Sequence, residues 1–165
     1  MSELNDANIK LDRMRYVKNT ASSRLCYLAI LLNVLYFVSI YKSDVGNWYY
    51  QILIGASVVY NLLFMLMAFL ASEGVKNYQA SYSWLLYFLG AGQIVRIFIL
   101  PLQAHSALVK IGGEEMLVMG NAQFIRVVAY LVISAVCLVA AAVINQTKCA
   151  ALTGHLKSLE AKEGA

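Results

Sequence analysis

The sequence predicts an all-α integral membrane protein with four transmembrane helices in an up-down-up-down bundle. The composition is the first indication, because 61% of the residues are hydrophobic, only 13% are charged and the mean hydropathy is +0.65, whereas soluble domains are about 45–50% apolar and about 25% charged. Four apolar runs, each close to the roughly 17–25 residues that cross a bilayer, are the second indication. The short links between the first three runs are the third, since short links join antiparallel neighbours.

The four spans are expected at about 24–41, 48–71, 82–103 and 125–145. The first span competes with a cleaved signal peptide. We favour a span, because the preceding charged region is long and contains acids, and no clear cleavage site of small residues is present. The link from Lys42 to Asn47 contains the turn formers Asp44 and Gly46, and it is too short for anything but a helical hairpin.

Residues 1–23 are expected to form a cytoplasmic amphipathic segment. Apolar residues recur at Leu4, Ala7, Leu11 and Met14, a spacing typical of one helical face. The basic residues of this segment and at the start of the first span are predicted to bind anionic inner-leaflet lipids, at about 1 kcal/mol each near the surface. They are Lys10, Arg13, Arg15, Lys18 and Arg24. The same pattern also suits a helix contact with another subunit or a second copy of the chain.

The distribution of basic residues predicts the orientation of the chain. Positive charge gathers in cytoplasmic flanks, and the first flank is the richest in Lys and Arg. Both termini are therefore expected in the cytoplasm, with the plasma membrane as the location. Residues 146–165 are expected to form a cytoplasmic helical tail in which Leu152, Leu156 and Leu159 share one face.

The third link, residues 104–124, is longer than the other two and is expected outside the cytoplasm. Short apolar runs flank Gly112 and Gly113, which indicates a hairpin or a segment folded onto the bilayer surface. We expect a cap over the bundle, with a loop as the alternative. Glu114 and Glu115 are the carboxylates on this side that could approach the bundle interior if the cap dips into it.

Polar residues inside the spans are few, and they fall at one depth. Asn33, Asn61, Gln93 and Ser134 each come from a different span. At 1.5 Å per residue, all four are expected roughly 13–15 Å from the cytoplasmic side. The sequence therefore predicts a mid-membrane polar layer.

Arg96 lies one helical turn beyond Gln93, on the same face. A charge at this depth costs at least about 2.5–3.5 kcal/mol and needs partners. Three hypotheses compete. In the first, amide oxygens of Asn33, Asn61 and Gln93, together with backbone carbonyls, satisfy the guanidinium. In the second, a carboxylate of another chain pairs with it, and in the third it lines an aqueous path that favours anions.

The sequence argues against several function classes. No Asp, Glu, Lys or His falls inside the expected spans, so a proton-coupled carrier, a metal site or an intramembrane hydrolase lacks its usual residues. The basic residues form no separate nucleic-acid-binding domain, and the cysteines Cys26, Cys137 and Cys149 predict no disulfide framework. We therefore expect a non-enzymatic accessory or scaffolding subunit of a membrane assembly such as a transport complex, without cofactors. The alternative is a small homo-oligomeric channel or anion-permeable pore that uses Arg96.

Overall fold

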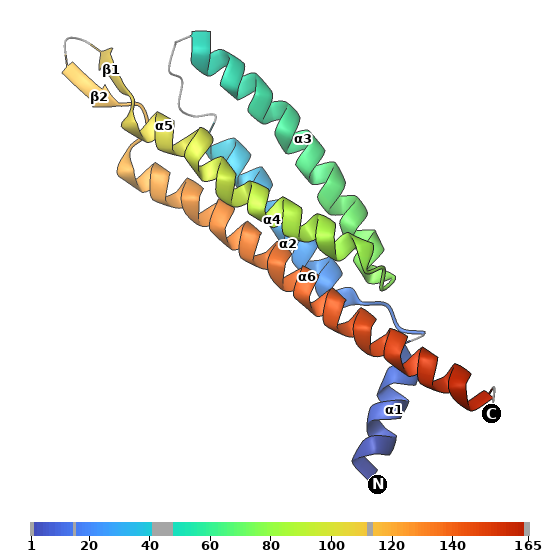
Figure 1. The fold of residues 1–165 in the computed structure, drawn as a ribbon. Helices are drawn as coiled ribbons and strands as arrows, with labels where there is room; N and C mark the ends of the chain where they lie inside the picture. Colours follow the sequence, from blue (N-terminus) through green and yellow to red (C-terminus); the bar gives the residue numbers. More distant parts are fainter. Residues whose placement is uncertain (1, 15, 41–47, 112–113, 164–165) are drawn as a thin grey trace.

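The computed structural model describes residues 2–14, 16–40, 48–111 and 114–163 (Figure 1). Only the backbone is described for residues 2–7, 48–51, 109–111, 114–116 and 162–163. The elements follow one another as α1 (Ser2–Met14), α2 (Thr20–Ile40), α3 (Trp48–Lys76), α4 (Ser81–Ile99), α5 (Pro101–Ser106), β1 (Leu108–Ile111), β2 (Glu114–Leu117) and α6 (Asn121–Glu163).

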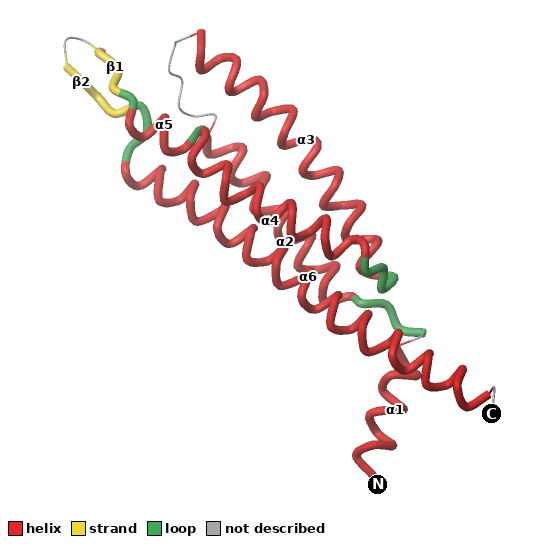
Figure 2. The backbone as a smooth tube through the Cα atoms, viewed as in Figure 1, coloured by secondary structure: helices red, strands yellow, loops and turns green. Residues whose placement is uncertain are grey.

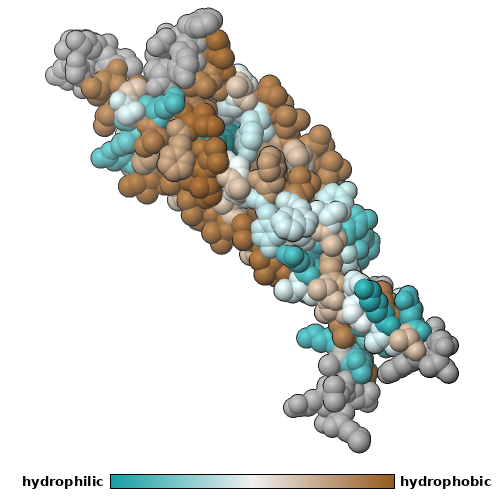
Figure 3. Space-filling model, in the orientation of Figure 1, coloured by the Kyte–Doolittle hydropathy of each residue, from teal (hydrophilic) through white to brown (hydrophobic). Residues whose placement is uncertain are grey.

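Within the described residues, four helical segments are long and apolar enough to cross a membrane, as predicted: Thr20–Ile40, Ile52–Lys76, Ser81–Ser106 and Asn121–Ala161. Their surfaces carry many exposed apolar side chains, among them Leu31, Leu62, Phe88 and Val136. On the face shown in Figure 3, hydrophobic residues cover most of the long helices, and hydrophilic residues gather toward the end that carries both termini. Such a surface fits hydrocarbon rather than water, so the chain is an integral membrane protein.

The long helices pack unequally. In Figures 1 and 2, α2, α4 and α6 lie together along their length, whereas α3 meets them at its carboxyl end and diverges toward Trp48. The junction is close: a Cβ at Gly74 would lie only 2.2 Å from the Tyr82 ring, so only glycine fits there. Nearby, the amide of Asn19 donates to the carbonyl of Lys76 (2.9 Å), which ties the start of α2 to the end of α3.

The third span is broken near Pro101. α4 ends at Ile99, and α5 begins with Pro101 at its first turn, where the missing N–H is tolerated. The segment 81–106 therefore continues as two helices, and the amide of Ala104 donates to Leu100 O at 2.9 Å. Proline has no backbone N–H to continue the hydrogen bonds of α4, which explains the position of the break.

The segment between α5 and α6 contains the predicted hairpin. β1 and β2 pair antiparallel with Leu108 opposite Leu117 and Ile111 opposite Glu114, and the connecting residues 112–113 lie outside the described chain. The hairpin extends from the end of α5 (Figure 1). Its return to α6 is held by His105, whose Nδ1 lies 3.1 Å from Met119 O and whose ring stacks on Phe124. The fold is thus helical with one small two-stranded hairpin.

The last span and the expected tail form one continuous helix, α6, of 43 residues. The distal part of α6 packs against α1: His155 Nε2 lies 2.9 Å from Asp12 Oδ1, and the His155 side chain is buried. Together, α1 and the distal part of α6 project from the long helices at the end with both termini (Figure 2).

Candidate functional site

Buried polar residues divide the core into two apolar clusters. One cluster includes Ala29, Phe64, Leu86 and Leu138, and lies toward the termini. The other, toward the hairpin, includes Tyr36, Leu100 and Leu131. Between the two clusters lies a central polar layer, which consists of Asn33, Ser57, Asn61, Gln93, Arg96 and Ser134.

Helical spacing brings Gln93 and Arg96 to the buried face of α4. Buried residues recur on this helix at Leu86, Leu89, Gly90, Gln93 and Arg96, three or four positions apart, as one face of a helix requires. Arg96 is 4% exposed and Gln93 is fully buried. Their side chains therefore point into the helix assembly rather than toward lipid.

The Arg96 guanidinium connects three helices. Nη1 donates to Asn33 Oδ1 on α2 (3.0 Å), and Nη2 donates to Ser57 Oγ on α3 (3.1 Å). The guanidinium carbon lies 4.1 Å from the centroid of the Tyr36 ring and 4.9 Å from that of Tyr60. Hydrogen-bond acceptors and ring faces thus share the stabilisation of a charge that is expensive at this depth.

Gln93 extends the layer to the fourth helix. Its Nε2 donates to Asn33 Oδ1 (3.3 Å) and to Ser134 Oγ (3.4 Å), and Ser134 Oγ donates to Ala29 O (3.3 Å). Asn33 Oδ1 accepts from both Gln93 and Arg96, so Asn33 is the residue on which the layer depends most.

Asn61 behaves differently from its expected role. It is 1% exposed, yet neither its Nδ2 nor its Oδ1 has a hydrogen-bond partner within the described part of the chain. The prediction that the Asn61 and Gln93 oxygens satisfy Arg96 is wrong, because Gln93 Oε1 also lacks a partner there. The reason is depth: α3 and α4 run in opposite directions, so the residue on α3 at the level of Arg96 is Ser57, one turn before Asn61.

Three contributors were not predicted as site residues. Ser57 carries no distinctive pattern, and its role follows from its position on α3 at the level of Arg96 on α4. The fully buried Tyr36 follows Asn33 by three positions, and Tyr60 follows Ser57 by three, so each ring lies on the face of its polar neighbour. An aromatic residue three positions after a mid-span polar residue was the available signal.

A second polar group, the terminus-side cluster, lies near the other end of the spans. Asn145 Nδ2 donates to Ser83 Oγ (2.9 Å), Asn145 Oδ1 accepts from Asn19 Nδ2 (3.3 Å), and Asn19 Oδ1 accepts from Lys148 Nζ (3.0 Å). These contacts join α6 to the start of α4 and to the residue before α2.

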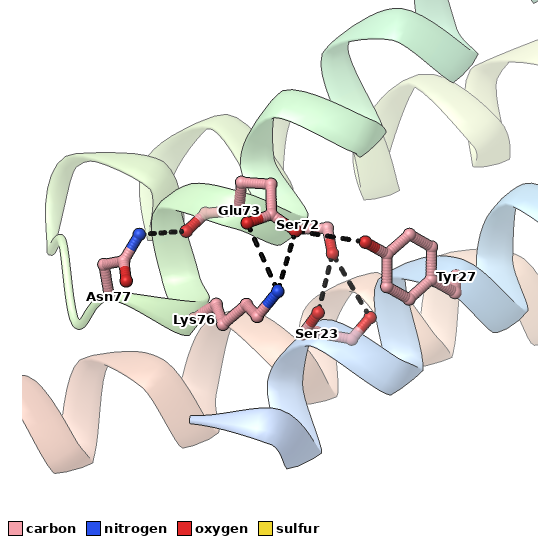
Figure 4. Close-up of polar contacts among 6 residues, drawn as sticks. All are labelled: Ser23, Tyr27, Ser72, Glu73, Lys76 and Asn77. Carbon is pink, nitrogen blue, oxygen red and sulfur yellow. Dashed lines mark hydrogen bonds and ion pairs between the residues drawn. The ribbon is translucent and has the colours of Figure 1, made fainter. Parts of the chain in front are cut away.

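Figure 4 shows the part of this cluster at the end of α3. Ser23 and Ser72 share a hydrogen bond of 2.8 Å, and Glu73 accepts from Tyr27 (3.2 Å) and from Lys76 (3.1 Å). The cluster therefore fastens α3 to α2 where the two helices are closest.

The remaining predicted residues are placed as follows. Lys10, Arg13, Lys18 and Arg24 are exposed, as contact with lipid headgroups requires. Arg15 and the side chains of Glu114 and Glu115 lie outside the described residues, so the approach of these carboxylates to Arg96 is not described.

All three cysteines are free and buried. Among the described residues, no group of three or more His, Cys, Asp or Glu side chains could hold a metal.

Comparisons with known proteins give no family for this chain. No protein-family model, curated protein or solved structure matches it.

Proposed function

We propose that the chain is a non-enzymatic accessory or scaffolding subunit of a larger membrane assembly, such as a transport complex. The observation that carries this proposal is the projecting arm formed by α1, by Tyr16 and Val17, and by the distal part of α6. Outside the candidate spans, this arm exposes Ile9 (45%), Tyr16 (86%) and Val17 (59%). Exposed aromatic and aliphatic side chains in such a place suit burial against a partner protein.

The proposal includes an up-down-up-down arrangement in the plasma membrane with both termini in the cytoplasm. Its support is the charge distribution. Four basic residues lie before or at the start of the first span, namely Lys10, Arg13, Lys18 and Arg24, whereas Lys42 is the only basic residue in the sequence of the link 41–47. The contact between Asn19 and Lys76 adds a further basic residue to the terminus side. The basic residues of the arm also suit anionic headgroups of the inner leaflet.

Purification in a mild detergent, followed by mass measurement, tests the subunit proposal. We expect a particle of defined stoichiometry that is heavier than one chain. Combined Tyr16→Ser and Val17→Ser substitutions should release the partner, while the lipid-facing control Val136→Ser should retain it. A wild-type particle with the mass of a single chain would contradict the proposal.

A small homo-oligomeric channel or anion-permeable pore is the second candidate. One observation favours it: Arg96 is a cation at mid-span that borders a cavity between α3 and α4. Chloride flux into liposomes that contain wild-type or Arg96→Ala protein tests this function. The absence of wild-type flux, or equal flux through both proteins, would eliminate it.

A further inference from the structure

A lateral groove lies between α3 and α4, where α3 diverges. Its volume is about 540 Å³, within the range of about 300–1,000 Å³ that is usual for ligand sites. Apolar residues form its walls, including Leu53, Phe88, Val95 and Ile99. Phe88, Val95 and Ile99 are 71%, 58% and 44% exposed. Because these residues belong to candidate spans, the groove opens toward hydrocarbon.

Three polar residues are among those that line this groove: Arg96, Ser57, which accepts from Arg96 Nη2, and Tyr60. Gly92 permits this arrangement, because a Cβ there would lie 2.8 Å from Tyr60 Oη. The Tyr60 ring in turn lies against the guanidinium. The groove thus combines an apolar slot with a cationic, hydrogen-bonding end, which is the usual composition of a site for an amphipathic ligand.

We propose that this groove binds a single-chain fatty-acid carboxylate, with the carboxylate at Arg96, Ser57 and Tyr60 and the acyl chain along the apolar walls. A guanidinium is the side chain best suited to a carboxylate. From Arg96, the lining of α4 runs eight residues to Phe88, roughly 12 Å at 1.5 Å per residue. That length holds the first part of one extended acyl chain, and the rest of the chain continues into the hydrocarbon that the groove faces.

Depth and width argue against two other occupants. Arg96 lies ten residues before Ser106, the nearer end of its candidate span, or roughly 15 Å from it. A phospholipid would have to bring a phosphate-bearing headgroup and two acyl chains to that depth, whereas a fatty acid brings one chain and a single carboxylate that pairs with Arg96. A transmembrane helix is about 10–12 Å wide with its side chains, which is too bulky for a slot of this volume. The fatty-acid site does not depend on the proposed subunit function.

Binding of radiolabelled palmitate to the purified protein in lipid nanodiscs tests the proposal. Ala56 lines the groove and is exposed, so Ala56→Trp should fill the slot without touching the central polar layer. The matched control is Ala140→Trp, which fills an apolar cleft of about 500 Å³ lined by residues of α4 and α6. We expect saturable binding that Ala56→Trp weakens at least about tenfold and that Ala140→Trp leaves within about twofold.

Competition by hexadecanol tests the role of the charge. We expect the neutral alcohol to compete at least about tenfold less well than unlabelled palmitate, because it cannot form a charge-assisted pair with Arg96. Val95→Trp is the second groove-filling variant if thermal unfolding shows that Ala56→Trp is misfolded. Absence of saturable wild-type binding, equal binding by wild type and the groove-filled variant, or equal competition by the alcohol would overturn the proposal. Photo-crosslinking from position 56 to a phospholipid or to another protein helix would overturn it as well.

Discussion

At the scale of single residues, the central polar layer assigns unequal roles to similar side chains. Asn33 and Asn61 are both 1% exposed. Asn33 Oδ1 accepts from Arg96 and Gln93, whereas Asn61 has no hydrogen-bond partner in the described chain. An amide in an apolar surrounding costs free energy unless it is paired. Asn33 thus stabilises the fold through its hydrogen bond with Arg96. The unpaired Asn61 amide lowers the free energy of unfolding, and packing elsewhere offsets this loss.

This difference predicts opposite effects of the same substitution. Asn33→Leu should lower the free energy of unfolding by about 3 kcal/mol, because it removes the acceptor of a buried charged donor and of Gln93. Asn61→Leu should be neutral or raise it by up to about 1 kcal/mol, because no hydrogen bond is lost. Thermal unfolding in mild detergent measures both, and each variant is the control for the other. Equal destabilisation would mean that Asn61 has a partner in the folded state.

The residue types of the layer were predictable from the sequence, but their pairing was not. Polar residues are rare enough in apolar runs that Asn33, Gln93 and Arg96 stand out, and helical spacing places the last two on one face. Pairing depends on how far one helix is shifted along its neighbour. Arg96 lies one turn beyond Gln93, and at that level the residue on α3 is Ser57 and not Asn61, so Ser57 is the acceptor.

At the scale of elements, the end of α3 is set by its backbone hydrogen bonds. The Gln79 amide donates to Gly74 O and the Tyr78 amide to Val75 O, the pattern of a Schellman cap. Tyr78 occupies the left-handed position of this cap, with φ 56. Glycine is usual there, because any Cβ is strained in that region. The cap turns the chain from α3 into α4 over four residues.

Two substitutions at Tyr78 separate the backbone strain from the ring contacts. Tyr78→Gly and Tyr78→Ala both remove the ring, but only glycine relieves the strain. The glycine variant should therefore exceed the alanine variant by about 1 kcal/mol in unfolding free energy. Thermal unfolding of the two variants, compared directly, measures this. Equal stability would show that position 78 does not hold the left-handed conformation.

A second contact between elements holds α1 against α6. It brings together residues 143 positions apart in the chain, Asp12 and His155. Asp12→Ala should free α1, so limited proteolysis should remove the N-terminal segment several-fold faster than in wild type. Arg13→Ala, a neighbouring exposed residue, is the matched control and should leave the cleavage rate unchanged. A wild-type rate for Asp12→Ala would show that this contact does not hold α1.

The elements were predictable to different degrees, for physical reasons. Apolar runs of membrane-spanning length identify the spans, and Pro101 marks the break between α4 and α5. The terminus-side cluster was missed, because Asn19, Ser83 and Asn145 lie near span ends, where polar residues are ordinary. The divergence of α3 was also missed. Exposed apolar residues look the same in the sequence whether they face lipid, a groove or another helix.

At the scale of the whole molecule, the long helices are held together near the termini, whereas α3 and α4 are separated toward the hairpin. The terminus-side cluster and the close approach of Gly74 to Tyr82 fasten all four long helices near the termini. Toward the hairpin, α3 stands away from α4 and leaves the lateral groove. Local opening is favoured where buried contacts are few. Local separation of the long helices is therefore expected first between α3 and α4, beside Arg96.

The proposed membrane orientation makes a prediction about the whole molecule. If the termini are cytoplasmic, the end with α5 and the hairpin faces outward. Ser106 and Ser158 are both exposed and lie near opposite ends of the long helices. In intact cells, a membrane-impermeant maleimide should label Ser106→Cys but not Ser158→Cys, and permeabilisation should make both reactive. The native cysteines are buried, so wild-type protein supplies the background. The reverse labelling pattern would invert the topology, and the basic arm would then face away from the anionic leaflet that its charge suits.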